Sequence, residues 1–440
     1  MILLSAGMFM LSPRAVKISD FFKGSKNEQQ PGLWILTSSL VISWLFAKSI
    51  TNAADLGQAF GFVGGVAYAG YYLSFLVAGI IIYQLRVKGG FESIHQFLGT
   101  KFGNKAVLLF TLLITFRLFN EIWSNSMVIG SYFGEAGSMS YYLAVLLFTG
   151  LTLLYTLKGG MRSSLLTDFI QMLLFGVLLA IILGYIFPKT EGGIKTLVGT
   201  GTWSLDQGLN LLLVALLQCL SYPFHDPVMT DRGFLSDPKK TLKAFIWAGI
   251  IGGICIMLFS FVGVFGRLEQ LDKPVVLEVS RLFGLGMTLV INLIMVTSAA
   301  STIDSTLTSS VKLIHLDVFK SRTLSIKSGR LTMVFVAVAG TLPVFLNPEI
   351  LSATTISGTM VLGLAPVFIL WRTKVPAVSF FLAVGAGILS GLVLVFGWIP
   401  PQLLISKGKY ADLLTANLYG TLAVFAGYLL PLIWHKTNEE

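Results

Sequence analysis

Apolar stretches of about 20 residues recur along the whole chain, and they limit what it can fold into. Inside a bilayer every backbone polar group must be paired within the protein, so only helices and closed barrels span it. The short alternating segments of an outer-membrane barrel are absent from the sequence. A hydrophobic content of 55%, only 12% charged residues and a mean hydropathy of +0.81 exclude a soluble globular protein. We therefore expect one integral membrane domain with no soluble module attached.

The apolar stretches predict transmembrane helices near 33–57, 60–85, 104–132, 139–157, 163–187, 207–230, 241–266, 283–314, 330–347, 350–372, 376–398 and 411–434. The first twelve residues, MILLSAGMFMLS, are apolar but too short to span. They lack the charged start and the cleavage site of a signal peptide, so a truncated helix ahead of the main bundle is expected. Cys219 and Cys255 fall in apolar helices, which implies no disulfide framework.

The net charge of +10 is explained by membrane topology. With a cytoplasmic amino terminus, Lys and Arg concentrate in the predicted inner loops, for example Arg86 and Lys88 after the second helix and Lys239 and Lys240 after the sixth. This asymmetry obeys the positive-inside rule. It predicts a multi-pass protein of the plasma (inner) membrane, with the lipid bilayer and not nucleic acid as its partner.

Residues 298–310 read SAASTIDSTLTSS, which places many hydroxyl groups and one carboxylate directly after the apolar run 285–296. A charged side chain in mid-bilayer costs roughly 2.5 to 3.5 kcal/mol on insertion scales, and such residues usually mark an ion or substrate path. Hydroxyl and carboxylate oxygens are the ligands that hard cations prefer. The stretch therefore predicts a cation site.

Six ionisable residues lie at membrane depth in the predicted helices, and together they favour a transport pathway: Lys48, Arg117, Glu121, Asp168, Asp226 and Asp304. Several have a purely structural interpretation. Arg117 and Glu121 have the i,i+4 spacing of a neutralising pair, and Asp168 near a helix start suits the helix dipole.

Lys48 and Asp304 are harder to explain structurally, because each lies well inside an apolar helix. Lys48 also sits among polar residues of the first helix, Ser43, Ser49, Thr51 and Asn52. Broken transmembrane helices are the usual way in which transporters expose backbone carbonyls to an ion. We expect such a break in this helix.

Four segments together resemble the sodium/solute symporter family, which includes sodium-coupled sugar, proline and sialic acid carriers. They are KGGMRSSLLTDFIQ at 158–171, Ser298-x-x-Ser301-Thr302 followed by DVFK at 317–320, FHDPVMTDRGF at 224–234, and FESIHQFLGTKFG at 91–103. The set is specific, although no single segment would be.

The resemblance implies an all-α integral membrane protein of about 12 transmembrane helices, with the inverted five-helix repeat of the LeuT-like transporter fold. Repeat one would be 33–187 and repeat two 207–372, together a transport core over 33–372. Residues 1–32 would precede it as the truncated helix and a cytoplasmic segment, and 373–440 would add two helices. The implied function is sodium-coupled import of a small polar solute by alternating access, with Na⁺ as the coupling ion.

The resemblance also implies a sodium site between the first and eighth helices. Its ligands would be the backbone carbonyls of Ile42, Leu45 and Ser298 and the hydroxyls of Ser301 and Thr302. Hydroxyls and carbonyls hold sodium weakly enough to release it in a transport cycle.

A further sodium site of some family members corresponds to Asp168, Ser301, Asp304 and Ser305. Asp304 departs from the family pattern, which usually has a hydroxyl or small residue there. Two facing carboxylates favour a second sodium, and the alternative is that one of them holds a proton.

The implied substrate-binding residues are Lys48, Ser49, Glu121, Tyr222, His225 and Asp226. A lysine at this place favours a carboxylate-bearing solute, and a lysine opposite Asp226 and Glu121 would suit a zwitterion. The competing structural interpretation is a Lys48–Asp226 salt bridge that acts as an inner gate. The aromatic residues Trp44, Phe46, Trp123, Tyr222 and Phe224 are candidates for the pocket wall.

Two other classes compete with a sodium symporter. An intramembrane enzyme would need a nucleophile–base pair or metal ligands, and neither an HExxH nor a GxSxG signature occurs. A carrier-like sensor that acts through a partner, or a proton-coupled carrier, stays an alternative.

Overall fold

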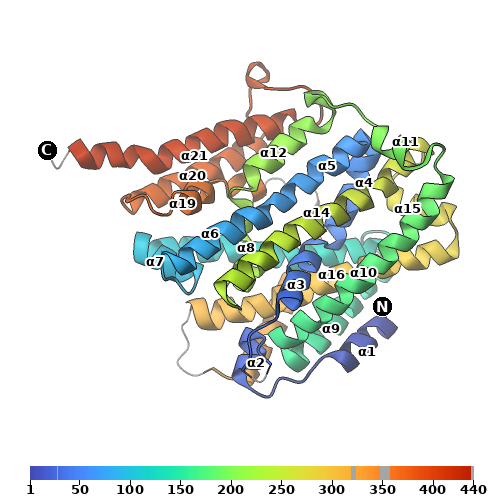
Figure 1. Ribbon diagram of the computed structural model, residues 1–440, viewed down its shortest axis with the longest axis horizontal. Coiled ribbons are helices and arrows are strands. Elements are labelled where there is room, and N and C mark those ends of the chain that lie inside the picture. Colours follow the sequence, from blue (N-terminus) through green and yellow to red (C-terminus); the bar gives the residue numbers. More distant parts are fainter. Residues whose placement is uncertain (27, 319–323, 347–356, 438–440) are drawn as a thin grey trace.

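The structure is a computed structural model that describes residues 1–26, 28–318, 324–346 and 357–437. Within these ranges the chain is helical, and nine helices are long and apolar enough to cross a membrane, or ten if the bent pair α3 and α4 forms one span. This confirms the expected all-α membrane class. Figure 1 shows the helices as one bundle, with α20 and α21 at one edge and α1 beside α9 at the other.

The helices with membrane length are as follows: α5 and α6 (Phe62–Ala69 and Leu73–Val87), α8 (Asn104–Ser131), α9 (Met139–Gly159), α10 (Met161–Lys189), α14 (Pro238–Leu268), α16 (Leu285–Lys312), α17 (Ile326–Thr341), α20 (Val378–Val395) and α21 (Ala411–Thr437). Their positions agree with the predicted segments. The predicted helix 350–372 begins outside the described residues, and its described part contains α19 (Leu364–Ile369).

Short helices join these spans: α1 (Ile2–Leu11), α2 (Ile18–Lys23), α7 (Ile94–Phe102), α11 (Gly193–Gly199) and α15 (Val275–Leu282). The leading apolar segment therefore does form a short helix, as expected. Of the DVFK motif at 317–320, residues 319 and 320 lie outside the described residues.

The first predicted helix is broken, as expected. It consists of α3 (Leu33–Trp44) and α4 (Ala47–Phe60), which meet at 60°. Neither Gly nor Pro stands at the break, so local sequence alone does not cause it. Tertiary contacts support it instead, because the Tyr72 hydroxyl donates to the Trp44 carbonyl at 2.8 Å and the Thr302 hydroxyl reaches the Ser43 carbonyl at 3.5 Å.

The prediction of one continuous helix over 207–230 is wrong. The segment is divided into η2 (Leu205–Leu209), α12 (Asn210–Gln218), η3 (Tyr222–His225) and α13 (Pro227–Arg232). Pro223 and Pro227 lack a backbone N–H and so interrupt the helical hydrogen bonds. Two helices of the bundle are therefore interrupted at depth.

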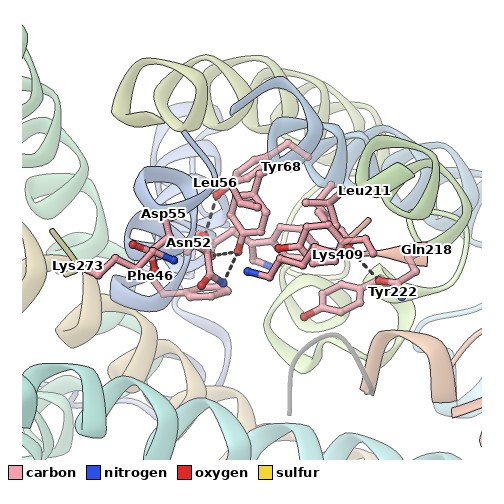
Figure 2. A pocket seen from close by; sticks show the side chains of 15 residues that line it. Phe46, Asn52, Asp55, Leu56, Tyr68, Leu211, Gln218, Tyr222, Lys273 and Lys409 are labelled. Carbon is pink, nitrogen blue, oxygen red and sulfur yellow. Dashed lines mark hydrogen bonds between the residues drawn. The ribbon is translucent and has the colours of Figure 1, made fainter. Parts of the chain in front are cut away.

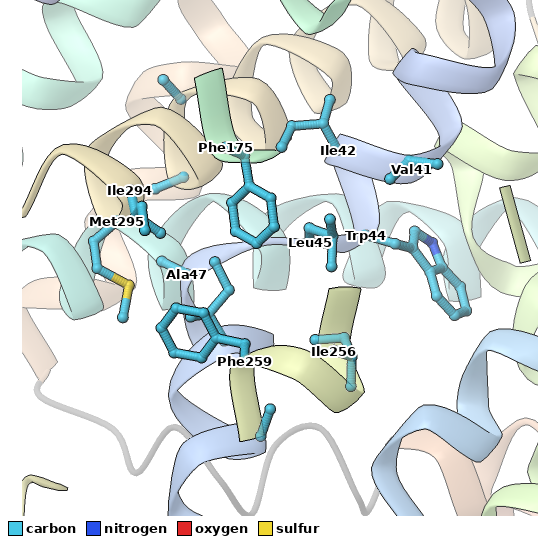
Figure 3. Packing of buried hydrophobic residues seen from close by; sticks show 14 of the residues in the cluster. Val41, Ile42, Trp44, Leu45, Ala47, Phe175, Ile256, Phe259, Ile294 and Met295 are labelled. Carbon is cyan, nitrogen blue, oxygen red and sulfur yellow. The ribbon is translucent and has the colours of Figure 1, made fainter. Parts of the chain in front are cut away.

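The break between α3 and α4 lies in the apolar centre of the bundle. Figure 3 shows Ile42 and Leu45 packed with Phe175 of α10 and with residues of α14 and α16 such as Phe259 and Ile294. All of these side chains are buried. Backbone carbonyls freed at such a place are costly unless a donor or a cation satisfies them.

Close backbone contact fixes α4 against α14. A Cβ atom added to Gly263 would lie 2.5 Å from the Ala54 carbonyl carbon and 2.8 Å from the Gln58 nitrogen, and one added to Gly57 would collide with the Ser260 carbonyl. Small residues allow membrane helices to approach in this way. The half of the broken helix after the break is therefore held directly against α14.

Candidate cation and solute sites

The oxygen-rich stretch of α16 is buried along its whole length, and four of its hydroxyl residues divide between two neighbouring places. Ser298 and Thr302 lie towards the break between α3 and α4, because Thr302 contacts Ser43 there and its hydroxyl also donates to the Ser298 carbonyl at 3.0 Å. Ser301 and Ser305 instead contact Asp168 of α10. The division follows from helical periodicity, since positions 298 and 302 share one face and 301 and 305 the next.

The chemistry of the break suits a sodium ion. Within the described residues, no hydrogen bond reaches the carbonyl oxygens of Ile42 or Leu45, and the Ser298 hydroxyl is buried without a partner. Together with Thr302 and the Ser43 carbonyl, these groups offer neutral oxygens only. Neutral oxygens are ligands for a weakly held hard cation. The residues predicted for the first sodium site therefore fit the ion, apart from Ser301, whose hydroxyl faces the other cluster.

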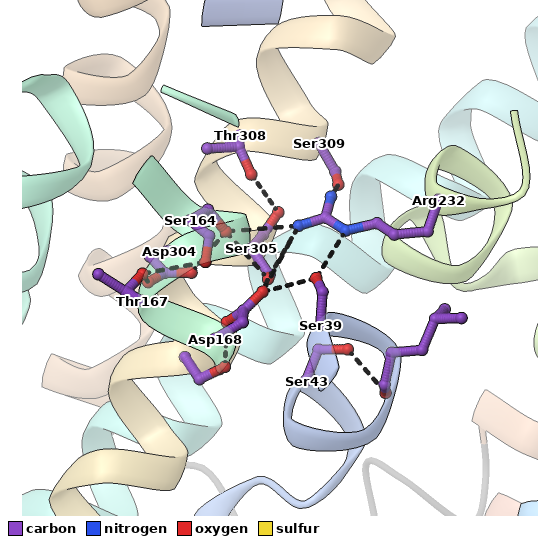
Figure 4. Close-up of polar contacts among 12 residues, drawn as sticks. Ser39, Ser43, Ser164, Thr167, Asp168, Arg232, Asp304, Ser305, Thr308 and Ser309 are labelled. Atoms are coloured by element: carbon purple, nitrogen blue, oxygen red, sulfur yellow. Dashed lines mark hydrogen bonds and ion pairs between the residues drawn. The ribbon is translucent and has the colours of Figure 1, made fainter. Parts of the chain in front are cut away.

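Asp168 and Asp304 come together in a second cluster, shown in Figure 4. Asp168 accepts hydrogen bonds from Ser39 at 2.6 Å, from Ser305 at 3.1 Å and from Ser301. Ser164 links the two carboxylates, because its hydroxyl lies 2.8 Å from Asp304 Oδ1 and 3.2 Å from the Ser305 hydroxyl.

Asp304 itself is surrounded by hydroxyl groups. The Tyr155 and Thr167 hydroxyls donate to Oδ2 at 2.8 and 3.0 Å, and the Ser164 hydroxyl donates to Oδ1. Its side chain is completely buried. No ion pair within 4 Å reaches Asp304 from the described residues, so only neutral groups satisfy this carboxylate.

Arg232 is the buried residue of this cluster that sequence reasoning missed. It follows the prolines of the interrupted helix, where the charge pattern assigns it to a basic inner loop, yet its side chain has 0% exposure. Its guanidinium donates to Ser39 at 3.2 Å, Ser305 at 3.0 Å and Ser309 at 2.8 Å, and lies 4.0 Å from Asp168. The detectable signal was the Asp231–Arg232 pair directly after a segment with two prolines.

The buried cluster carries an unbalanced formal charge. Asp231 pairs with Arg232 at 3.0 Å and also with Lys312, so these residues join the same group. As ionised side chains, Asp168, Asp231 and Asp304 outnumber Arg232 and Lys312 by one negative charge. An uncompensated buried charge is expensive, so the cluster has the electrostatics of a site for one more cation.

A cavity of about 130 Å³ lies next to the helix break. Cavities of roughly 150 Å³ hold one benzene-sized molecule, so this one suits a small solute. Figure 2 shows its lining, in which seven of the fifteen side chains are aromatic, including the two residues that flank Leu45. The lining residues are Trp44, Phe46, Ser49, Asn52, Asp55, Leu56, Tyr68, Tyr71, Tyr72, Leu211, Gln218, Tyr222, Lys273, Lys409 and Tyr410.

Of the predicted substrate residues, Ser49 and Tyr222 line this cavity. Lys48, Glu121, His225 and Asp226 are buried next to it but are not part of its lining. Among the predicted aromatic residues Trp44, Phe46 and Tyr222 form the wall. Trp123 packs in a separate apolar cluster with Met127 and Tyr141, and Phe224 stacks on Phe368 at 4.1 Å.

Lys48 has a different partner from the one considered for an inner gate. Its ammonium lies 3.0 Å from Glu121 and 3.1 Å from the Ser124 hydroxyl, with an exposed side-chain fraction of 2%. Arg117 pairs with Glu121 and lies 3.6 Å from Asp226, which also accepts from the Trp44 indole at 3.1 Å. The Lys48–Asp226 pair of the competing interpretation does not form, and a chain of ion pairs takes its place, in which Arg117 lies between the two carboxylates.

Comparison with known proteins gives a consistent result. The sequence model of the sodium:solute symporter family matches residues 29–232. The mouse sodium/glucose cotransporter 1 is 26% identical over 261 residues, which cover 53% of this chain and 36% of the relative. The mouse solute carrier family 5 member 4B is 24% identical over 161 residues, which cover 36% of this chain and 24% of the relative. The chain thus spans only about a quarter to a third of the length of these curated relatives.

Two solved structures share the fold. A substrate-bound, outward-open sodium-coupled sialic acid symporter superimposes with a TM-score of 0.74 at 17% identity, covering 98% of this chain and 96% of that one. A nucleobase-cation-symport-1 family transporter, closed around bromovinylhydantoin, gives 0.62 at 13% identity, with 95% of both chains covered. The expected LeuT-like transporter fold is therefore confirmed. The matched relatives and structures are transporters.

Proposed function

We propose that this chain, which is related to the sodium:solute symporter family through residues 29–232, is a sodium-coupled carrier of a small polar solute. One observation carries the proposal. The break between α3 and α4 presents Trp44 and Phe46 to a solute-sized cavity, and the adjacent Ser43 carbonyl meets Thr302 of α16. A cation bound at the break would therefore act directly on the residues that wall the cavity.

The sodium ligands in this proposal are the carbonyls of Ile42, Leu45 and Ser298 and the hydroxyls of Ser298 and Thr302, with the Ser43 carbonyl within reach. A sodium ion would satisfy the buried oxygens that have no donor within the described residues. It would hold α3 and α4 in their 60° arrangement against α16. Coupling follows, because a solute then meets a completed wall only when the ion is bound.

A second cation is proposed for the cluster of Asp168, Asp304, Ser301 and Ser305. The formal charge excess and the absence of an ion pair to Asp304 within the described residues support it. Arg232 already compensates Asp168 at 4.0 Å, so the added cation belongs nearer to Asp304. Sodium is our first assignment and a proton is the alternative, and the number of sodium ions bound per chain distinguishes them.

The solute is proposed to contact Ser49 and Tyr222 directly. Lys48, Glu121 and Asp226 would act behind the wall, because their ion pairs connect α4, α8 and the segment before α13. His225 would likewise act behind the wall, because its ring lies 4.7 Å from the ring of Tyr222. These residues would set the position of Trp44 and Tyr222 rather than bind the solute.

Alternating access is proposed to use the two interrupted helices of 33–60 and 205–232 as equivalent parts of two repeats, over 33–187 and 207–372. The cavity is lined by Lys273 and Lys409, from loops that the charge distribution assigns to the outer face. The Arg232 cluster connects α3, α10, α13 and α16, and none of its residues lines the cavity. The arrangement fits an outward-facing carrier in the plasma membrane with a cytoplasmic amino terminus.

The test is uptake into proteoliposomes under an imposed inward sodium gradient. Labelled glucose, sialic acid, proline and benzoate would each be compared with a potassium-only gradient of equal ionic strength. Accumulation that requires the sodium gradient supports the carrier. Sodium-stabilised binding without accumulation of any of these solutes would instead favour a carrier-like sensor.

A further inference from the structure

Three charged residues, Asp55, Lys273 and Lys409, line the cavity, and we call this group the rim. We propose that this rim selects an anionic solute, a monocarboxylate whose neutral body enters the aromatic interior while its carboxylate stays between the two lysines. The inference rests on the proposed carrier function and names the class of solute that the carrier takes.

The segment that carries Lys273 is joined to α4 by contacts between residues that are distant in sequence. Arg267 donates to the carbonyls of Gln58 and Ala59 at 3.0 and 2.7 Å, and Gln58 donates to the Leu271 carbonyl at 2.6 Å. These bonds fasten the segment that carries Lys273 to the end of α4. The rim is therefore built by the fold and is not a chance meeting of free loops.

Lys409 is positioned by a second set of contacts. The Lys407 backbone nitrogen donates to Asp206 at 2.7 Å, and the Tyr410 ring lies 5.9 Å from that of Phe60. The first contact joins the segment before α21 to η2, and the second joins it to the end of α4. Figure 2 shows Lys273 and Lys409 among the side chains around the cavity, with Asp55 near Lys273.

The interior of the cavity supplies neutral polar groups only. Tyr68 donates to Ser49 at 3.2 Å and accepts from Asn52 at 3.4 Å, and Tyr71 donates to Gln218 at 3.1 Å. Aromatic faces and hydroxyl or amide groups suit the neutral part of a solute. Recognition of a charge must therefore come from the rim.

Lys48, the lysine first expected to bind a carboxylate, is not available for it. Its ammonium donates to Glu121, Asn120 and Ser124 at 3.0 to 3.3 Å, and Lys48 is not among the residues that line the cavity. By contrast, no ion pair within 4 Å involves Asp55, Lys273 or Lys409 in the part of the chain that the structure describes. The rim thus keeps a net charge of one positive unit, which complements one carboxylate better than a neutral sugar or a zwitterion.

The electrostatic part of the proposal is tested without knowing the solute. Asn52 lines the cavity and would be changed to Cys in a protein with Cys219→Ser and Cys255→Ser, since neither native cysteine lines it. The introduced thiol would react with an anionic methanethiosulfonate reagent (sulfonatoethyl) and a cationic one (trimethylammonioethyl), forming a mixed disulfide and releasing methanesulfinate. We expect the anionic reagent to react faster, relative to a small free thiol, by at least about threefold.

Changing both Lys273 and Lys409 to Met should abolish or reverse that preference. Lys407→Met is the matched control, because Lys407 is an exposed lysine of the same loop that does not line the cavity, and it should leave the preference unchanged. Equal rates for the two reagents, or no reaction of either reagent with the Asn52→Cys protein, would overturn the proposal. Retention of the preference in the double Lys variant would overturn it too.

The solute class is tested by thermal stabilisation of the purified protein in sodium buffer. Benzoate is paired with benzamide and glucuronate with glucose, so that each pair differs in the carboxylate. The acid should stabilise more than its neutral partner in at least one pair, and the double Lys variant should lose the difference. Equal shifts within both pairs would overturn the proposal, whereas loss of gradient-driven uptake with the acid preference intact would reject only the carrier function.

Discussion

At the scale of single residues, Arg232 and Asp304 show how buried charge is managed in this bundle. Arg232 is satisfied by serine hydroxyls from α3 and α16 and by two carboxylates, whereas Asp304 has hydroxyl partners alone among the described residues. A buried charge is tolerated only when its surroundings supply opposite charge or many dipoles. Arg232 therefore serves as a fixed internal cation, and Asp304 is the place where a mobile one is expected.

The first prediction concerns Arg232→Gln. Removing one member of a buried ionic network leaves the others uncompensated, so the free energy of unfolding should fall by about 3 to 5 kcal/mol. Thermal unfolding in detergent measures this as a lowered Tm. Arg162→Gln is the matched control, because Arg162 pairs with Asp20 at 3.5 Å and is partly exposed, and it should cost about 1 kcal/mol or less. An Arg232→Gln protein as stable as the control would contradict the role of the guanidinium.

The second prediction concerns Asp304→Asn, which removes the charge and keeps the shape. Equilibrium binding of ²²Na⁺ to the purified protein should saturate at about two ions per chain in the original protein and at about one in the variant, because the excess negative charge is gone. Asp412→Asn, an exposed carboxylate at the start of α21, should leave the number unchanged. The same stoichiometry in Asp304→Asn and the original protein would remove sodium from the second site and leave the proton as its cation.

At the scale of elements, the two interrupted helices bring the sites together. Helix α3 ends and α4 begins where Trp44 and Phe46 reach the cavity, and the second interruption delivers Tyr222 to the cavity and Arg232 to the cluster. Backbone of this irregular kind is tolerated at membrane depth only where protein or a cavity surrounds it. Each interruption thus places side chains at the cavity or the cluster where a continuous helix would not place them.

A third prediction follows from the contact between α4 and α14. Gly263→Ala should force these helices apart, because the added Cβ would stand 2.8 Å from the Gln58 nitrogen and closer still to Ala54. The Tm should fall, and sodium binding at the break should weaken with it, because a shift of α4 would also shift the Leu45 carbonyl directly before it. Gly286→Ala in α16 meets nothing within 4 Å and should be neutral or stabilising by up to about 1 kcal/mol. Equal effects of the two substitutions would show that the close approach is unimportant.

Much of this element arrangement was predictable from the sequence, and the exceptions have physical causes. Helix positions, the break near Lys48 and the oxygen-rich face of α16 could be predicted, because hydropathy and polar residues at depth are local signals. The partner of Lys48 could not be predicted, since the choice between Glu121 and Asp226 depends on how α4 and α8 pack. Arg232 was assigned to a basic inner loop because it follows the predicted end of the sixth helix at 230, and its burial depends on residues of α3, α10 and α16 that are distant in sequence. The withdrawal of Lys48 from the cavity follows from the same packing.

At the scale of the whole molecule, one helix break lies between the cavity and the proposed sodium site. Two residues from loops, Lys273 and Lys409, line the cavity, and the Arg232 cluster connects α3, α10, α13 and α16. An ion that orders the break would make the cavity wall complete, and its release would let the wall relax. Sodium binding at the break is therefore the central claim, on which coupling and solute selection both depend.

The most direct test of that claim is ²²Na⁺ binding to the purified protein with Ser298→Ala and Thr302→Ala combined. Both hydroxyls face the break, so their loss should raise the Kd for the site by at least about tenfold, which is about 1.4 kcal/mol. Ser310→Ala is the control, because that hydroxyl donates to the Leu307 carbonyl of its own helix at 2.7 Å, and sodium binding should be unchanged. Saturable sodium binding that is weakened in the double variant and retained in the control is the expected result. Unaltered affinity in the double variant, or no saturable binding in the original protein, would contradict the account.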